Sequence, residues 1–307
     1  MSPRHILLAL FLGLLLSAHG QQPSSHARPD PFLPDSITKK IDSIFGSQRG
    51  AFALAFKDLT TGKQLLIREH EPFHAASTMK VPVMIELYHQ ASLGHLKLSD
   101  SLVLKNEFTS IADSSLFHLD SADDSEQELY KHIGEKRTIH ELVYQMITVS
   151  SNFATNLLID KVSALNITAT LQELGAADIH VLRGVEDNAA YQRGMNNTVT
   201  AYGLLILFEK MASHTLISPA ASKSMIRVLL DQHYNEIIPA RLPAGTQVAH
   251  KTGWIKGINH DAGIVFLPGN QTYVLVLLSK DTEDDKASIA AMAAVSEILY
   301  KYVTSRL

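Results

Sequence analysis

The stretch FHAASTMKVPVMIELYHQ (residues 73–90) places Lys80 three positions after Ser77, at the start of an apolar helical pattern. Residues three apart on a helix are neighbours. A serine hydroxyl becomes an effective nucleophile only when a base takes its proton, and a lysine can be that base where burial lowers its pKa. The spacing therefore indicates a nucleophile beside its base. The alternative is a helix-capping serine followed by a lysine that extends to solvent.

Two later stretches add further polar groups beside apolar segments. In VSSNFATN (149–156), Ser150 and Asn152 lie between two helical patterns, so a short loop can point a hydroxyl and an amide into a cleft. In HKTGW (250–254), Lys251, Thr252 and Gly253 lie on a predicted strand. There an ammonium, a hydroxyl and backbone N–H groups can surround a carboxylate and a carbonyl. Each stretch alone is weak evidence, because both tripeptides are common in turns.

In this order, the Ser-x-x-Lys, Ser-Ser-Asn and Lys-Thr-Gly stretches resemble the serine β-lactamase and penicillin-binding protein superfamily, and most of all the class A β-lactamases. The resemblance runs from about residue 35 to residue 307. It implies an α/β fold of the β-lactamase/transpeptidase-like type, with an antiparallel sheet flanked by helices, an all-helical domain and a catalytic cleft between them. The α/β part is expected at about 35–75 and 215–307, and the helical part at about 76–214.

The resemblance also implies a role for each matched residue. Ser77 is expected to be the acylated nucleophile of a β-lactam hydrolase, Lys80 to help move its proton, and Ser150 to pass a proton to the lactam nitrogen. The implied binding residues, which contact the substrate's amide, carboxylate and carbonyl groups, are Asn152, Lys251, Thr252, Gly253 and Trp254. The bulky tryptophan is unusual in the family. Its backbone N–H still serves the oxyanion hole, together with that of the nucleophile, but access is expected to be narrowed.

A loop carboxylate is expected to activate the water that releases the product. In LRGVEDNAAYQRGMNNTVTA (182–201), Glu186 matches the family's general base by position. The asparagine expected four residues later is replaced by Ala190, although Asn188 lies near enough to help hold the water. Asp187 is an alternative base. In the third interpretation, Glu186 is a solvated carboxylate or a partner of Arg193.

The same loop departs from the family at its far end. Arg183 matches the family's loop arginine, but Asn197 stands where the family usually has the aspartate that pairs with it. The segment between the first two motifs is also longer than usual and contains FHLDSADDSEQELY (117–130). We expect this insertion at the rim of the cleft, where Phe117 or Tyr130 would supply an aromatic wall for substrate. The alternative is a solvated acidic loop.

The candidate site residues must be positioned by a sheet, and the predicted strands lie near both ends of the chain. DSITKKIDSIF (35–45) predicts a helix capped by Asp35, and GAFALAFKD (50–58) with KQLLIRE (63–69) predicts a hairpin with Gly62 in its turn. Three further strands are predicted within 242–281, followed by an alanine-rich helix at 285–303. The sheet buries both faces only if the terminal strands join and the first and last helices cover one side.

The composition restricts the cellular context and the partners. The 307 residues carry a formal charge of −4 without a basic cluster, which argues against nucleic acid. Residues 1–20 resemble a cleavable signal peptide and 21–34 a linker, which predicts a periplasmic or secreted protein without a membrane anchor. There is no cysteine, and the fifteen histidines show no dense metal-ligand spacing. We therefore expect a monomer that acts on a small β-lactam without metal or cofactor.

Two rival functions remain open. A DD-peptidase that acts on cell-wall peptides shares the three motifs and has no need of a loop glutamate. A module that is acylated and never turns over would be a binding or sensing protein.

Overall fold

The structure is a computed structural model that describes residues 32–306. The predicted signal peptide (1–20) and most of the predicted linker (21–34) lie outside the described residues. Within 32–306, no helix is long and apolar enough to cross a membrane. The same residues contain no group of three or more His, Asp or Glu side chains placed to hold a metal ion.

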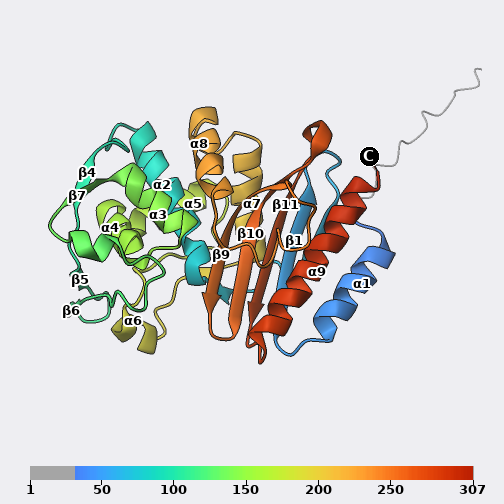
Figure 1. Cartoon of the computed structure of the whole chain (residues 1–307), viewed down its shortest axis with the longest axis horizontal. Helices are drawn as coiled ribbons and strands as arrows, with labels where there is room; N and C mark the ends of the chain where they lie inside the picture. Colours follow the sequence, from blue (N-terminus) through green and yellow to red (C-terminus); the bar gives the residue numbers. More distant parts are fainter. Residues whose placement is uncertain (1–31, 307) are drawn as a thin grey trace, which may run out of the picture. The chain divides into compact units, whose positions relative to one another are not determined.

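A five-stranded antiparallel sheet is built from both ends of the chain (Figure 1). Its strands lie in the order β2-β1-β11-β10-β9. They are β1 (Ala51–Asp58), β2 (Gln64–Ile67), β9 (Gln247–Ile255), β10 (Ile258–Phe266) and β11 (Thr272–Lys280). The pairing of β1 with β11 joins the two terminal sets of strands, as predicted. Gly62, which has φ of +73°, makes the predicted β1–β2 turn.

Helices α1 (Asp35–Gly46) and α9 (Asp285–Thr304) cover one face of the sheet, which confirms the predicted arrangement (Figure 1). Ile41 and Leu299 are among the fully buried side chains of this layer. The predicted cap of α1 was wrong by one residue, because Pro34 occupies the N-cap and makes no side-chain bond. Packing begins before the helix, since Leu33 is buried and its N–H donates to the Gln64 carbonyl.

The opposite face of the sheet packs against helical elements that lie between β2 and β9 in the chain. Helix α7 contacts the central strands, and the other helices extend from it around a second apolar core (Figure 1). The helices are α2 (Lys80–Ser92), α3 (Ile139–Thr148), α4 (Asn152–Val162), α5 (Ala164–Glu173), α6 (Asn188–Gln192), α7 (Ala201–Ala212) and α8 (Pro219–Leu230). Short 3-10 turns are η1 (Ala76–Met79), η2 (Leu129–His132) and η3 (Pro268–Asn270).

Three small two-stranded sheets pair segments of the chain that connect the helices of this region. They pair β3 (Phe73–His74) with β8 (Thr198–Val199), β4 (Ser101–Val103) with β7 (Lys136–Thr138), and β5 (Phe108–Thr109) with β6 (Leu116–Phe117). The β3–β8 pair joins the segment just before Ser77 to the end of the loop that carries Glu186. Two segments that the sequence separates widely are thereby fixed side by side.

Candidate active site

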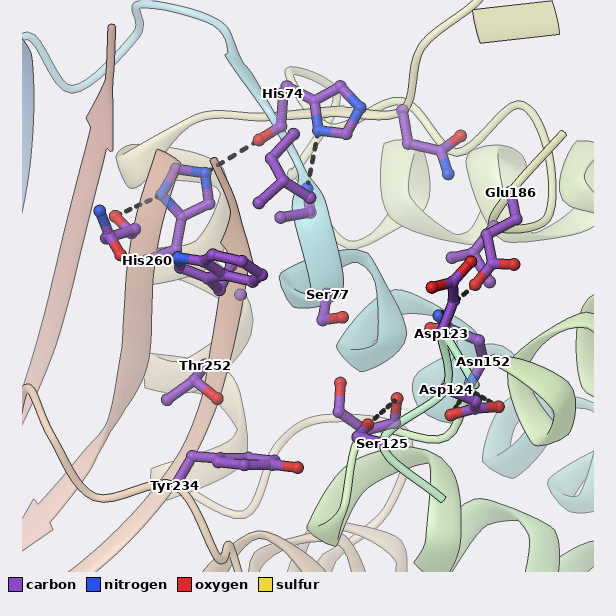
Figure 2. A pocket seen from close by; sticks show the side chains of 18 of the residues that line it. His74, Ser77, Asp123, Asp124, Ser125, Asn152, Glu186, Tyr234, Thr252 and His260 are labelled. Atoms are coloured by element: carbon purple, nitrogen blue, oxygen red, sulfur yellow. Dashed lines mark hydrogen bonds between the residues drawn. The ribbon is translucent and has the colours of Figure 1, made fainter. Parts of the chain in front are cut away.

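A cleft of about 940 Å³ lies between the sheet edge formed by β9 and the helical elements. Most of the predicted site residues line it, namely Ser77, Ser150, Asn152, Glu186, Thr252, Gly253 and Trp254. Ser77 lies centrally, with Thr252 on one side and Asn152 and Glu186 on the other (Figure 2). Lys80 and Lys251 are fully buried beside the cleft.

Ser77 occupies the 3-10 turn η1, directly before the buried helix α2. Its neighbour Ala76 has φ of +43°, an unusual conformation for a residue with a side chain. Strand β9 approaches this turn so closely that a Cβ atom added to Gly253 would lie 3.0 Å from the Ser77 nitrogen and 3.1 Å from the Thr78 nitrogen. Such contacts are tighter than nearly all real Cβ contacts, so glycine lets the strand come this close to the nucleophile without displacing the turn.

Lys80 is held by acceptors on the neighbouring loop. Its Nζ donates to the Ser150 carbonyl at 2.7 Å, to Ser150 Oγ at 3.1 Å and to Asn152 Oδ1 at 2.9 Å. Burial lowers its pKa to about 7, while the carboxylates of Asp124 and Glu186 act in the opposite direction. A large neutral fraction therefore exists near pH 7. The alternative in which Lys80 extends to solvent is wrong, because the side chain is completely buried.

Ser150 lies in the predicted loop between α3 and α4, with φ of +60°. Its Oγ accepts from Lys80 and also from Lys251 Nζ at 3.1 Å. Burial and the charge of Lys80 lower the pKa of Lys251 well below its ordinary value, and Asp261 opposes this. A strained backbone at a hydroxyl shared by two buried amines is typical of a functional position.

Glu186 also has positive φ, at +60°. Its Oε1 accepts from Asn152 Nδ2 at 2.6 Å. Burial raises the pKa of Glu186, the bond from Asn152 lowers it, and the nearby charges of Asp124 and Asp123 raise it. Asn152 consequently links the loop carboxylate to the amine of Lys80.

The alternatives for the loop carboxylate are placed differently. Asp187 is buried and caps α6, accepting from Ser110 Oγ, Ile111 N and Ala190 N. Its oxygens are thus occupied away from the cleft. Arg193 donates to the Ala112 carbonyl and Asp113 rather than to Glu186. The nearby Asn188 does line the cleft, as the prediction of a water-holding amide requires.

The loop closes without the ion pair usual in the family. Asn197 Oδ1 accepts from the N–H groups of Leu182 and Arg183, and its Nδ2 donates to the Arg183 carbonyl. The buried Arg183 guanidinium instead donates to the Met195 and Gly184 carbonyls and to Asn196 Oδ1. Uncharged carbonyl and amide oxygens therefore bind the Arg183 guanidinium, in place of the aspartate carboxylate usual in the family.

The inserted segment reaches the cleft, but the aromatic wall expected from it is wrong. Phe117 packs against Phe108, and Tyr130 packs against Phe153 with ring centroids 4.7 Å apart. Both lie against the helical core instead of the cleft. The lining residues that the insertion contributes are Asp123, Asp124 and Ser125 (Figure 2). No sequence signal distinguishes these three residues, because each resembles a residue of a solvated acidic loop.

Two histidines border the nucleophile from the sheet side (Figure 2). His260 Nε2 lies 2.9 Å from the His74 carbonyl, and the Ala76 N–H donates to His74 Nδ1. Burial lowers the pKa of His260 to about 4, so it is neutral at pH 7. The next residue, Asp261, is fully buried and bonds to His250 Nδ1 and the Ile238 N–H.

Comparison with known proteins agrees with this architecture. The chain is 23% identical over 296 residues to the extended-spectrum β-lactamase PER-1 of Pseudomonas aeruginosa, with 88% of each chain covered. A β-lactamase from Sphaerobacter thermophilus superposes with a TM-score of 0.74 at 22% identity, covering 88% of this chain and 98% of that one. The structure of PBP-A gives a TM-score of 0.76 at 24% identity, covering 91% and 99%.

These superpositions confirm the predicted β-lactamase/transpeptidase-like α/β fold. The family model described as the β-lactamase enzyme family matches residues 36–303. Because the match spans nearly all of the described residues, this chain belongs to the β-lactamase enzyme family.

Proposed function

We propose that this protein is a serine β-lactamase that opens the lactam amide through an acyl-enzyme on Ser77 and frees the product with water activated by Glu186. The observation that supports it best is the continuous hydrogen-bonded line from Lys251 through Ser150, Lys80 and Asn152 to Glu186. The line joins a buried amine, three residues after Ser77 in the chain, to a carboxylate that lines the same cleft as Ser77.

Acylation uses the amine and hydroxyl end of this line. Ser77 Oγ attacks the lactam carbonyl carbon while its proton moves to neutral Lys80, and backbone N–H groups of Ser77 and Trp254 hold the developing oxyanion. When the C–N bond breaks, Ser150 gives a proton to the nitrogen and is reprotonated from Lys80. Lys251 and Thr252 bind the substrate carboxylate, and Asn152 binds its side-chain amide.

Deacylation uses the carboxylate end. Glu186 takes a proton from a water molecule, whose oxygen attacks the ester carbonyl, and the Ser77 oxygen leaves with a proton. A general base of this kind contributes about 10²- to 10⁴-fold to a rate. Burial favours the protonated form of Glu186, and the bond from Asn152 counteracts that effect. The engagement of Asp187 in capping α6 supports the assignment of the base to Glu186.

A DD-peptidase is the second candidate, favoured by the likeness to PBP-A. It would be acylated by a β-lactam without rapid release. The presence of Glu186 beside Asn152 favours hydrolysis over this function. For either candidate, the predicted leader supports a periplasmic or secreted location, and we propose that the protein is a monomer.

Intact-protein mass spectrometry with benzylpenicillin tests the proposal. The wild-type protein is expected to consume the drug without a lasting adduct, Glu186→Gln to retain one acyl group, and Ser77→Ala to gain none. Glu173→Gln, which removes an exposed carboxylate at the end of α5, is the control and should match wild type. A lasting adduct on the wild-type protein would favour the peptidase or the sensor. The absence of both an adduct and drug loss would exclude all three functions.

A further inference from the structure

The N-terminus of helix α4 is bound by a carboxylate from the inserted segment. Asp124 Oδ2 accepts from the Phe153 N–H at 2.8 Å, and both of its carboxylate oxygens lie 3.0 Å from the Asn152 nitrogen. These N–H groups belong to the first turn of α4 and have no carbonyl partner within the helix. A negative charge is favourable at this end of a helix.

Asp124 is itself firmly held. Only 4% of its surface is exposed. Its oxygens also accept from the Tyr130 hydroxyl at 2.9 Å and from the Glu126 N–H at 3.1 Å. Tyr130 in turn packs on Phe153. The first turn of α4 therefore also helps to position the tyrosine whose hydroxyl donates to Asp124. The Asp124 carboxylate is therefore a buried group with several hydrogen-bond donors, and it is not part of a solvated loop.

The second motif of the class A family reads Ser-Asp-Asn, whereas Ser151 stands in its middle position here. The Ser151 hydroxyl accepts from the Ala154 N–H and so caps α4 without adding a charge. We propose that Asp124 is the positioning residue of this site, supplying from the insertion the carboxylate that position 151 lacks and fixing Asn152 between Lys80 and Glu186. This role rests on the proposed function.

The connection to the reacting groups runs through one side chain. Asp124 binds the backbone of Asn152, whose amide accepts from Lys80 at 2.9 Å and donates to Glu186 at 2.6 Å. A shift of Asn152 therefore moves both groups. A misplacement of about 1 Å in such a constellation can cost about 100-fold in rate.

Asp124 also acts on Lys80 through its charge. It raises the pKa of Lys80 against the larger lowering effect of burial, as does Glu186. Lys251, which shares Ser150 Oγ with Lys80, is a further ionisable group beside it. Loss of the Asp124 charge should therefore move the pKa of Lys80 below about 7 and shift the pH dependence of acylation to lower pH.

Asp124→Asn and Asp124→Ala test the proposal against Asp120→Asn, which removes an exposed carboxylate from the same segment. We expect benzylpenicillin acylation to slow by about 10- to 100-fold in both Asp124 variants, with the midpoint of the pH profile lowered. Asp120→Asn should keep the wild-type rate. Amide hydrogen exchange, which needs no substrate, should be faster at residues 150–154 in the Asp124 variants alone.

The decisive variant combines Asp124→Asn with Ser151→Asp and so returns a carboxylate to the N-cap of α4. Partial recovery of both acylation and exchange protection would support positioning by the charge. Wild-type acylation and protection in Asp124→Asn would overturn the proposal. So would a loss of melting temperature and activity that Ser151→Asp leaves unrepaired. If the wild-type protein neither binds nor hydrolyses benzylpenicillin, the proposed function fails, and hydrogen exchange alone decides whether Asp124 holds this turn.

Discussion

Lys80 Nζ lies 2.7 Å from the carbonyl oxygen and 3.1 Å from the hydroxyl oxygen of Ser150, a residue 70 positions away in the chain. With Asn152 Oδ1, these oxygens provide three acceptors for the three protons of the ammonium form. Loss of one proton frees the lone pair with which Lys80 can serve as a base. Protonation of this amine is therefore expected to control acylation.

Acylation by benzylpenicillin should rise with pH through a midpoint near the Lys80 pKa of about 7. Glu186→Gln should lower this midpoint, because the Glu186 carboxylate raises the pKa of Lys80. Lys80→Arg, which keeps the charge but does not deprotonate, should acylate slowly at every pH. Rapid-quench measurements from pH 5 to 9 with mass detection supply these rates. A flat profile for the wild-type protein would contradict the assignment of Lys80 as the base.

Gly253→Ala should reduce acylation by at least about 10-fold, because the added methyl would press on the backbone nitrogens of Ser77 and Thr78. Neither backbone atom can rotate away, so the turn or the strand must move. Gly46→Ala is the matched control, since a Cβ there meets nothing within 4 Å. Acylation rates and melting temperatures of the two variants distinguish a displaced nucleophile from a general loss of stability. Equal rates in both would show that the strand tolerates the methyl group.

The sequence was sufficient to identify those parts that depend on local pattern and motif order. The apolar runs on both sides of Gly62 and after Pro243 predicted the strands. Apolar residues at helical spacing predicted α1, and an alanine-rich run predicted α9. The apolar neighbours of Lys80 made its burial one of two expectations, and the structure selects burial over extension to solvent. These features are encoded within a few residues of where they appear.

Individual side-chain contacts between distant segments, unlike the pairing of β1 with β11, were not predictable in this way. Asp124 is one of several acids in its segment, and only the folded chain brings it to Asn152. Phe117 and Tyr130 satisfied the chemistry of an aromatic wall, but burial against Phe108 and Phe153 determines where they lie. The residues around each of these side chains do not indicate which partner it contacts elsewhere in the chain.

Asn197→Asp should destabilise the protein by about 1 to 3 kcal/mol, although it restores the residue usual in the family. The Asn197 amide donates to the Arg183 carbonyl, and a carboxylate would place oxygen against oxygen there. The Arg183 guanidinium is already bound by Met195 and Asn196 oxygens. Urea unfolding at pH 7 measures the change, with Asn270→Asp, at an exposed asparagine in η3, as the control outside the loop. Greater stability of Asn197→Asp would mean that the guanidinium turns toward the new carboxylate.

His260→Gln should make stability less dependent on acid. The folded protein holds the His260 pKa at about 4, below its ordinary value of 6.5. Between these values the unfolded chain binds a proton that the folded chain does not, so the free energy of unfolding falls as pH falls. The full difference is about 3 kcal/mol, of which about 2 kcal/mol is lost between pH 7.5 and 5. Urea unfolding at both pH values should show a smaller loss in His260→Gln than in the wild-type protein, while His95→Gln, an exposed control, should behave as wild type. An equal loss in His260→Gln would mean that groups other than His260 govern acid stability.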